Sequence, residues 1–146
     1  MGVLYSAFPI ENDVREWLTD EGLPTPENDG RAPTPNGLMA ALDTLEDEAV
    51  SYNISEGVWQ AQIVDATSPE TGPWTMINVL EFSDADEPCR LYFEKGWPEL
   101  IVKIVHRIAQ KCGPIAIVPD TGCPPAVVES SSNVDNIVKT WEHLMG

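Results

Sequence analysis

The chain has 146 residues, of which 24 are acidic and eight are basic, so its formal net charge at neutral pH is −16. Hydrophobic residues make up 42% of it, which is ordinary for a globular protein with its own core. Such a charge repels nucleic acid phosphates and anionic lipid surfaces, so we expect no nucleic acid and no membrane as partners. No stretch approaches the ~18 uninterrupted apolar residues of a membrane helix.

The acidic residues are concentrated in the first part of the chain. Residues 1–88 hold 18 acidic residues and only Arg15 and Arg31 as bases, whereas residues 89–146 hold six acidic and six basic residues. The length predicts a single domain over residues 1–146, with an acidic portion followed by a charge-neutral portion. The three cysteines match no zinc or redox spacing, and the N-terminus has neither a basic region nor a long apolar run. We therefore expect a cytoplasmic protein without a cofactor or metal.

The acidic portion begins with a predicted strand and two predicted helices. Apolar and β-branched residues indicate a strand over residues 3–8, and an apolar stripe at helical spacing predicts a helix over residues 11–21. Residues 23–37 contain four prolines and two glycines and are typical of a loop. A second helix is expected over residues 38–47, and alternation of buried and polar positions predicts a strand over residues 54–66.

The next elements form a predicted hairpin. Residues 74–82 are apolar on both sides of the expected strand, which is typical of a central strand. The polar turn at residues 83–88 then leads into a strand within residues 89–94.

The charge-neutral portion is built around a predicted strand–helix–strand unit. Pro98 favours the first turn of a helix, and Gly113 followed by Pro114 indicates its end. The short apolar segments 91–93 and 115–118 flank this helix as strands. A helix that links two strands is the usual crossover of a parallel pair, so we expect these two strands to run in the same direction.

Two further elements complete the chain. Residues 126–128 are a candidate edge strand, and Asn133 is a suitable N-cap for a final helix that extends to Met145. The order of elements predicts an α+β fold: a mostly antiparallel sheet of four to six strands with three to four helices packed largely on one face.

One group of residues favours an enzyme or small-ligand site. Asp120-Thr-Gly122 resembles the catalytic loop of aspartic proteases, but those enzymes pair two such aspartates and this chain has one copy. A β-turn explains the triplet more simply. Cys123 follows it, and His106 lies on the polar face of the central helix. A site near Asp120, Cys123 and His106 is the alternative hypothesis, although no spacing selects it. The chain contains no phosphate-binding or serine-hydrolase motif.

A second group favours protein binding. Two short acidic runs lie in the acidic portion, and one tryptophan before the central helix is a candidate for an exposed interface anchor. The residues are Glu46, Asp47, Glu48, Asp84, Asp86, Glu87 and Trp97. Charge complementarity with a basic partner speeds association and selects the partner.

The preferred hypothesis is therefore a small, acidic, non-enzymatic interaction domain. A bacterial immunity or inhibitor protein that covers a basic partner fits this charge pattern. An enzyme with the site named above is the alternative, and a third interpretation is that the acidic residues only keep the protein soluble.

Overall fold

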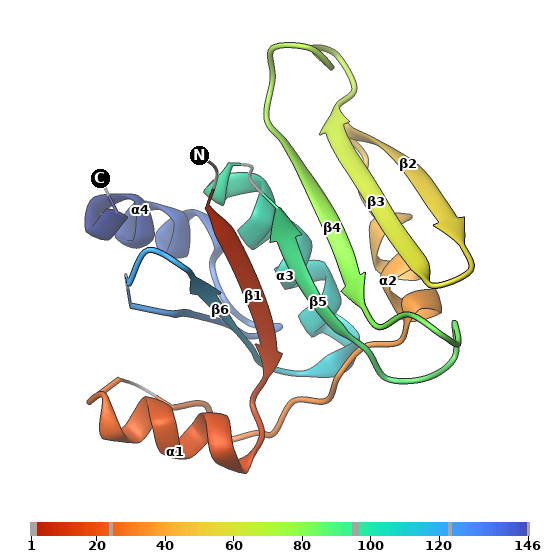
Figure 1. Cartoon of the computed structure of the whole chain (residues 1–146). Coiled ribbons are helices and arrows are strands. Elements are labelled where there is room, and N and C mark those ends of the chain that lie inside the picture. The colour runs from red at the N-terminus through yellow and green to blue at the C-terminus, as the bar shows by residue number, and fades with distance from the viewer. Residues whose placement is uncertain (1–2, 24, 95–96, 123, 146) are drawn as a thin grey trace.

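The computed structural model describes residues 3–23, 25–94, 97–122 and 124–145, the last four of these as backbone only. Its described part is an α+β fold with seven strands in one antiparallel sheet and four helices (Figure 1). The strands are β1 (Leu4–Pro9), β2 (Glu48–Ser55), β3 (Val58–Asp65), β4 (Trp74–Leu80), β5 (Arg90–Glu94), β6 (Ile115–Pro119) and β7 (Ala126–Val128). The helices are α1 (Asn12–Asp20), α2 (Pro35–Leu42), α3 (Pro98–Cys112) and α4 (Val134–Met145).

The first strand lies in the middle of the sheet, whose order is β2-β3-β4-β5-β1-β6-β7. Tyr5 of β1 lies opposite Phe93 of β5 on one side and Pro119 of β6 on the other. Because β5 and β6 are both antiparallel to β1, they are parallel to each other. The predicted crossover through α3 therefore has the expected direction, but β1 is inserted between the two strands that it connects.

The segment predicted as one strand over residues 54–66 is in fact the second half of a hairpin. Strands β2 and β3 pair along their whole length, from Glu48 opposite Asp65 to Ser55 opposite Val58. Gly57 in the turn has a φ of +75°, a conformation that glycine adopts without steric cost. The additional strand β2 raises the number of strands to seven, slightly above the predicted range.

The second helix is shorter and begins earlier than predicted. Thr34 accepts a hydrogen bond from the backbone N–H of Gly37 at 2.9 Å and so caps the N-terminus of α2. Pro35 occupies the first turn, where its missing N–H costs nothing. The helix ends at Leu42, so the acidic run that follows is not a helix end, and Glu48 is already the first residue of β2.

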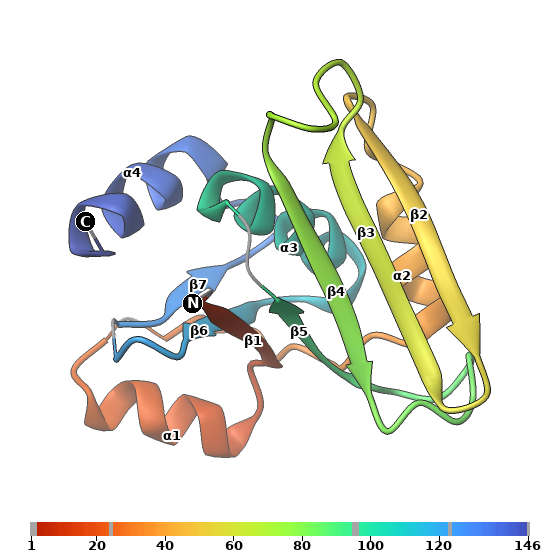
Figure 2. The same cartoon turned by 45° about the horizontal axis from the view of Figure 1, so that its top comes forward.

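Helices α2, α3 and α4 pack on one face of the sheet and enclose the main core (Figure 2). The apolar face of α3 contributes Ile101, Ile104 and Val105, which are fully buried together with Phe93 and Ile117 of the sheet. The prediction that the helices lie largely on one face is confirmed.

Helix α1 is the exception and packs on the opposite face. Ile10 and Leu18 form a small cluster with Ala116, whose neighbours in β6 point into the main core. Side chains alternate between the two faces along a strand, so Ala116 must face away from α3. The predicted apolar stripe of α1 is only partly used, because Trp17 remains 37% exposed.

We expect Ile104→Ala to lower the free energy of unfolding by about 2–5 kcal/mol, because it leaves a cavity between α3 and the sheet. Urea unfolding followed by circular dichroism measures this change. Lys111→Ala on the exposed side of the same helix is the matched control and should change it by less than about 0.5 kcal/mol. Equal effects of the two substitutions would contradict the packing of α3 described above.

Candidate protein-interaction surface

Most of the negative charge is exposed and unpaired. Between residues 11 and 87, every acidic side chain except those of Glu48 and Asp65 is exposed. Within the described ranges only three carboxylates form ion pairs, those of Asp29, Asp47 and Glu48. The folded protein therefore presents a field that attracts cations and that salt can screen.

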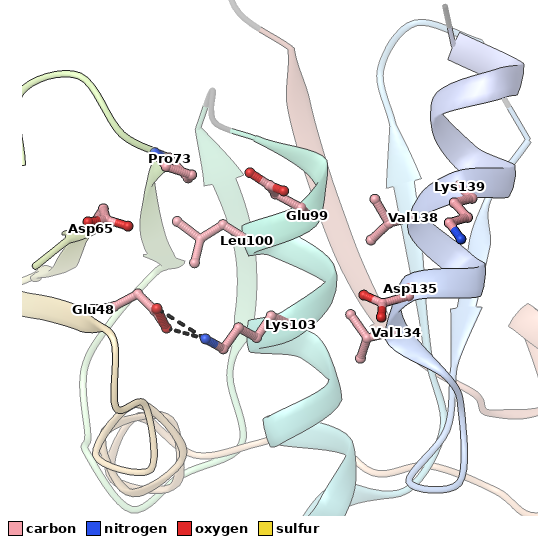
Figure 3. A pocket seen from close by; sticks show the side chains of 10 residues that line it. All are labelled: Glu48, Asp65, Pro73, Glu99, Leu100, Lys103, Val134, Asp135, Val138 and Lys139. Carbon is pink, nitrogen blue, oxygen red and sulfur yellow. Dashed lines mark hydrogen bonds and ion pairs between the residues drawn. The ribbon is translucent and has the colours of Figure 1, made fainter. Parts of the chain in front are cut away.

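Glu48 is the one predicted partner-binding acid that is used inside the protein. Both of its carboxylate oxygens accept hydrogen bonds from Lys103 Nζ on α3, at 2.6 and 3.1 Å, and its side chain is only 8% exposed (Figure 3). The Asp47 carboxylate lies 4.0 Å from the same Nζ. The pair ties the start of β2 to the middle of α3, so Glu48 acts as a structural residue, whereas Glu46 and Asp47 remain exposed.

A cleft of about 490 Å³ adjoins this ion pair, between α3, α4 and the start of β2 (Figure 3). Its wall carries both signs of charge, with Asp65, Glu99 and Asp135 as further acids and Lys139 as a second base. In the described part of the chain no three histidine, cysteine or acidic side chains are grouped in a way that would hold a metal ion. This cleft therefore offers no clear metal site.

Asp65 shapes the loop between β3 and β4. Its Oδ1 accepts hydrogen bonds from the backbone N–H groups of Ser68 and Thr67, both at 2.9 Å. These hydrogen bonds lower the pKa of Asp65 because they favour the charged form, and the bond from Ser68 has the largest effect. The carboxylate is therefore ionised at neutral pH and serves as a loop anchor.

The loop between β4 and β5 is held in place by the start of α2. Asp84 Oδ1 accepts a hydrogen bond from the backbone N–H of Asp86 at 2.8 Å, and Asp86 Oδ1 accepts one from Asn36 Nδ2 at 2.7 Å. The backbone N–H of Asn36 also donates to the carbonyl oxygen of Ala85 at 3.0 Å. The predicted acids Asp84, Asp86 and Glu87 thus lie on a fixed loop, where all three are exposed.

A recess of about 470 Å³ lies beneath this loop. Leu80 and Phe82 contribute apolar surface to it, Glu81, Asp84 and Glu87 contribute carboxylates, and Arg90 contributes one cation. Neither Leu80 nor Glu81 is among the predicted partner-binding residues. Exposure of Leu80 cannot be recognised from the sequence, because it depends on which face of the sheet each side chain of β4 takes. Ile77 and Val79 point toward the helices, and Leu80 points to the opposite face.

The predicted partner-binding residues do not form one continuous patch. The β4–β5 loop precedes Arg90, at the start of β5, whereas Trp97 comes after Glu94, at its end. Trp97 is 44% exposed, and it lies at the far end of the sheet from Asp84. Glu46 and Asp47 precede β2 at that same far end, because the start of β2 pairs with the end of β3, and the end of β3 pairs with the start of β4.

The residues of the alternative enzyme site are not brought together where the structure describes them. His106 Nε2 lies 3.1 Å from the carbonyl oxygen of Ser130. Ser130 follows the end of β7, which pairs with the start of β6, so His106 lies at that end of the sheet. Asp120 is exposed and follows the other end of β6, about 15 Å away at the usual rise per strand residue. Cys123 lies outside the described residues.

The described cysteines are free thiols, and neither is activated. Burial, followed by the influence of Cys112, raises the pKa of Cys89 to about 11. Burial also raises the pKa of Cys112. Both therefore remain protonated at neutral pH, which is the wrong state for a nucleophile.

Comparison with known proteins yields no match to any family model, curated protein or solved structure. Among the helices that the structure describes, none combines the length and the apolar composition that crossing a bilayer requires.

We expect Lys103→Met to destabilise the protein by about 1–3 kcal/mol, because it leaves the largely buried Glu48 carboxylate without its cation. Adding Glu48→Gln should restore part of this loss, since a neutral amide needs no cation. Urea unfolding of the single and double variants measures both effects. Lys139→Met, on the other wall of the same cleft, is the control and should change stability by less than about 0.5 kcal/mol. A Lys103→Met variant as stable as this control would show that the pair is not structural.

Proposed function

We propose that the protein is a small acidic interaction domain that binds a basic protein and covers its cationic surface. A bacterial immunity or inhibitor protein that neutralises a basic toxin in the cytoplasm is the kind of protein that best fits this description. The observation that carries the proposal is the large excess of exposed carboxylates without an ion-pair partner within the described ranges.

The position of the acids supports the proposal. They lie on helix α1, on turns and on loops, and the β4–β5 loop is held by hydrogen bonds from Asn36. Carboxylates on a fixed loop lose little conformational freedom on binding, so more of their attraction for a cationic partner is retained in the complex. Such a field also steers a basic partner toward the protein and raises the association rate.

The alternative enzyme site gains no comparable support. Asp120 and His106 lie at opposite ends of β6, and no recess described above is lined by either of them. The interpretation that the acids only maintain solubility makes a different prediction, because it requires no partner.

The test is to recover the natural partner from cells that make this protein, through an affinity tag, in 50 mM NaCl. We expect one basic protein in a one-to-one complex. Its association rate constant should fall at least about tenfold between 50 and 300 mM NaCl, and its dissociation rate constant should change much less. Stopped-flow fluorescence of the tryptophans measures both constants.

Two results would contradict the proposal. The first is the absence of any stoichiometric partner in low salt, which would favour the solubility interpretation. The second is a partner whose association rate does not respond to salt, because the acidic surface would then play no part in binding.

A further inference from the structure

The face of the sheet opposite α2, α3 and α4 is open over strands β1 to β5, where the outward side chains Leu4 and Phe8 of β1 are also exposed. Helix α1 covers only the side of this face formed by β6 and β7, through Ala116 and Val127. In Figure 1 helices α2 and α3 lie behind the strands, so the open face is turned toward the viewer. Alternation along each strand identifies the side chains that point outward on this face.

These outward side chains are almost uncharged, in contrast to the rest of the acidic portion. In the strands, all of which are described, only Arg90 and Glu94 carry a charge on this face. Asn78 is 7% exposed and accepts a hydrogen bond from Gln60 Nε2 at 2.8 Å, so its polar group is satisfied within the sheet. The open face therefore has the low charge that is typical of the centre of a protein interface.

One end of this face carries a row of exposed apolar side chains. Leu80 is 49% exposed, Phe8 is 40% exposed and Val58 is 36% exposed. In the antiparallel pairing of β3 with β4, Gln60 lies opposite Asn78. Two residues further along, Val58 of β3 therefore lies opposite Leu80 of β4. Leu80 of β4 lies opposite Arg90 of β5. On the other side of Arg90, the pairing of β5 with β1 places Phe8. We call Val58, Leu80 and Phe8 the apolar row.

Several carboxylates lie along one side of the apolar row, on the turn between β2 and β3 and on the loop between β4 and β5. Glu56 lies in the turn between β2 and β3, next to Val58, and Glu81 directly follows Leu80. Figures 1 and 2 both show the β2–β3 turn and the β4–β5 loop at the same end of the sheet. We call Glu56, Glu81, Asp84 and Glu87 the acidic rim; all four are exposed and none has an ion-pair partner in the ranges described.

We propose that the apolar row and the acidic rim together form the docking surface for the basic partner, an inference that rests on the function proposed above. The occupant is a protein surface that presents apolar side chains flanked by arginine or lysine. The apolar row would bury the partner's apolar side chains, and the rim would pair with its cations. An apolar centre with a polar rim is the usual anatomy of a protein interface.

Charge selects this occupant over the others that an apolar sheet face might receive. A second copy of the chain would bring four rim carboxylates against four of the same sign, and the net charge of −16 would oppose its approach. An anionic lipid surface would be repelled by the same rim. A basic protein is attracted by the rim and can still bury the row.

The recess beneath the β4–β5 loop indicates which side chain of the partner could bind there. Leu80 forms part of its wall, and Glu81, Asp84 and Glu87 line the same space of about 470 Å³ together with Arg90, so three carboxylates outnumber one cation there. An arginine side chain fits such a recess, because its aliphatic stem packs on apolar surface while its guanidinium pairs with carboxylates in a planar, bidentate way. We therefore expect an arginine of the partner at this position.

Two synthetic peptides test the docking surface without knowledge of the natural partner. One has seven residues of alternating arginine and leucine, and the other has serine in place of leucine at the same total charge. At 50 mM NaCl we expect the leucine peptide to bind the full chain about tenfold more tightly, because only it can use the apolar row. Isothermal calorimetry measures both affinities, and backbone amide shifts in nuclear magnetic resonance spectra locate the bound peptide.

Two substitutions should remove this preference without changing any charge. In Leu80→Ser and in Val58→Thr the two peptides should bind within about twofold of each other, whereas Trp17→Ser, which alters an exposed tryptophan on α1, should keep the tenfold difference. Circular dichroism establishes that each variant is folded, and Val58→Thr decides the matter if Leu80→Ser does not fold. Amide shifts should concentrate at residues 56–60 and 80–90.

The outcomes separate this inference from the function on which it rests. If both peptides bind the natural chain equally, or if the leucine preference survives in the folded variants, the docking surface is wrong. The acidic interaction domain is then still judged separately, by whether binding of the natural partner depends on salt. If neither peptide binds in low salt, the docking surface is also wrong. Recovery of no partner at all is the separate result that overturns the proposed function.

Discussion

The burial of helix α3 against the centre of the sheet is the interaction on which the rest of the structure depends. Ile101 and Ile104 are completely buried on the helix, and Phe93 and Ile117 are completely buried beneath it in the two strands that it connects. The N-terminal strand β1 is inserted between these two strands, and its Tyr5 and Ala7 belong to the same core as the buried face of α3. Lys103 on its outer side then ties the β2–β3 hairpin to the core through Glu48.

This core leaves most of the other face of the sheet open, which is where the proposed docking surface lies. Helices α2, α3 and α4 satisfy one face of the sheet, and α1 covers only the β6 and β7 side of the other. Among the side chains that the structure describes, no acidic residue belongs to the buried core, and Glu48 contributes to it only through its ion pair. The acidic residues therefore lie on turns and loops around a nearly uncharged sheet face, and the proposed docking surface rests on this arrangement.

The parts of the fold that were predicted correctly depend on local signals. Pro98 and Gly113 mark the two ends of α3, and the structure places the helix between them. The errors have non-local causes. The position of β1 between β5 and β6 depends on pairings across most of the chain, and the burial of Glu48 depends on a lysine that lies 55 residues away. The missed hairpin is the exception, because its turn residue Gly57 is a local signal in the sequence.

The candidate surface was predictable only in part. The acidic portion and the loop with Asp84 and Glu87 follow directly from the composition of the chain. The apolar row does not, because Phe8, Val58 and Leu80 are far apart in the sequence. Only the register of four strands places them on one line across the sheet, with Arg90 between Leu80 and Phe8. An exposed leucine at the end of an apolar strand cannot be distinguished from a buried one by its pattern alone.

Hydrogen–deuterium exchange of the protein with and without its natural partner tests the central claim most directly, because it maps the covered surface without any substitution. We predict slower exchange on binding at residues 54–60 and 80–90, around the apolar row and the acidic rim. Exchange in α1 and at residues 43–47 should not change. Protection confined to α1, or to the segment that contains Glu46 and Asp47, would show that the partner binds elsewhere and would contradict the account.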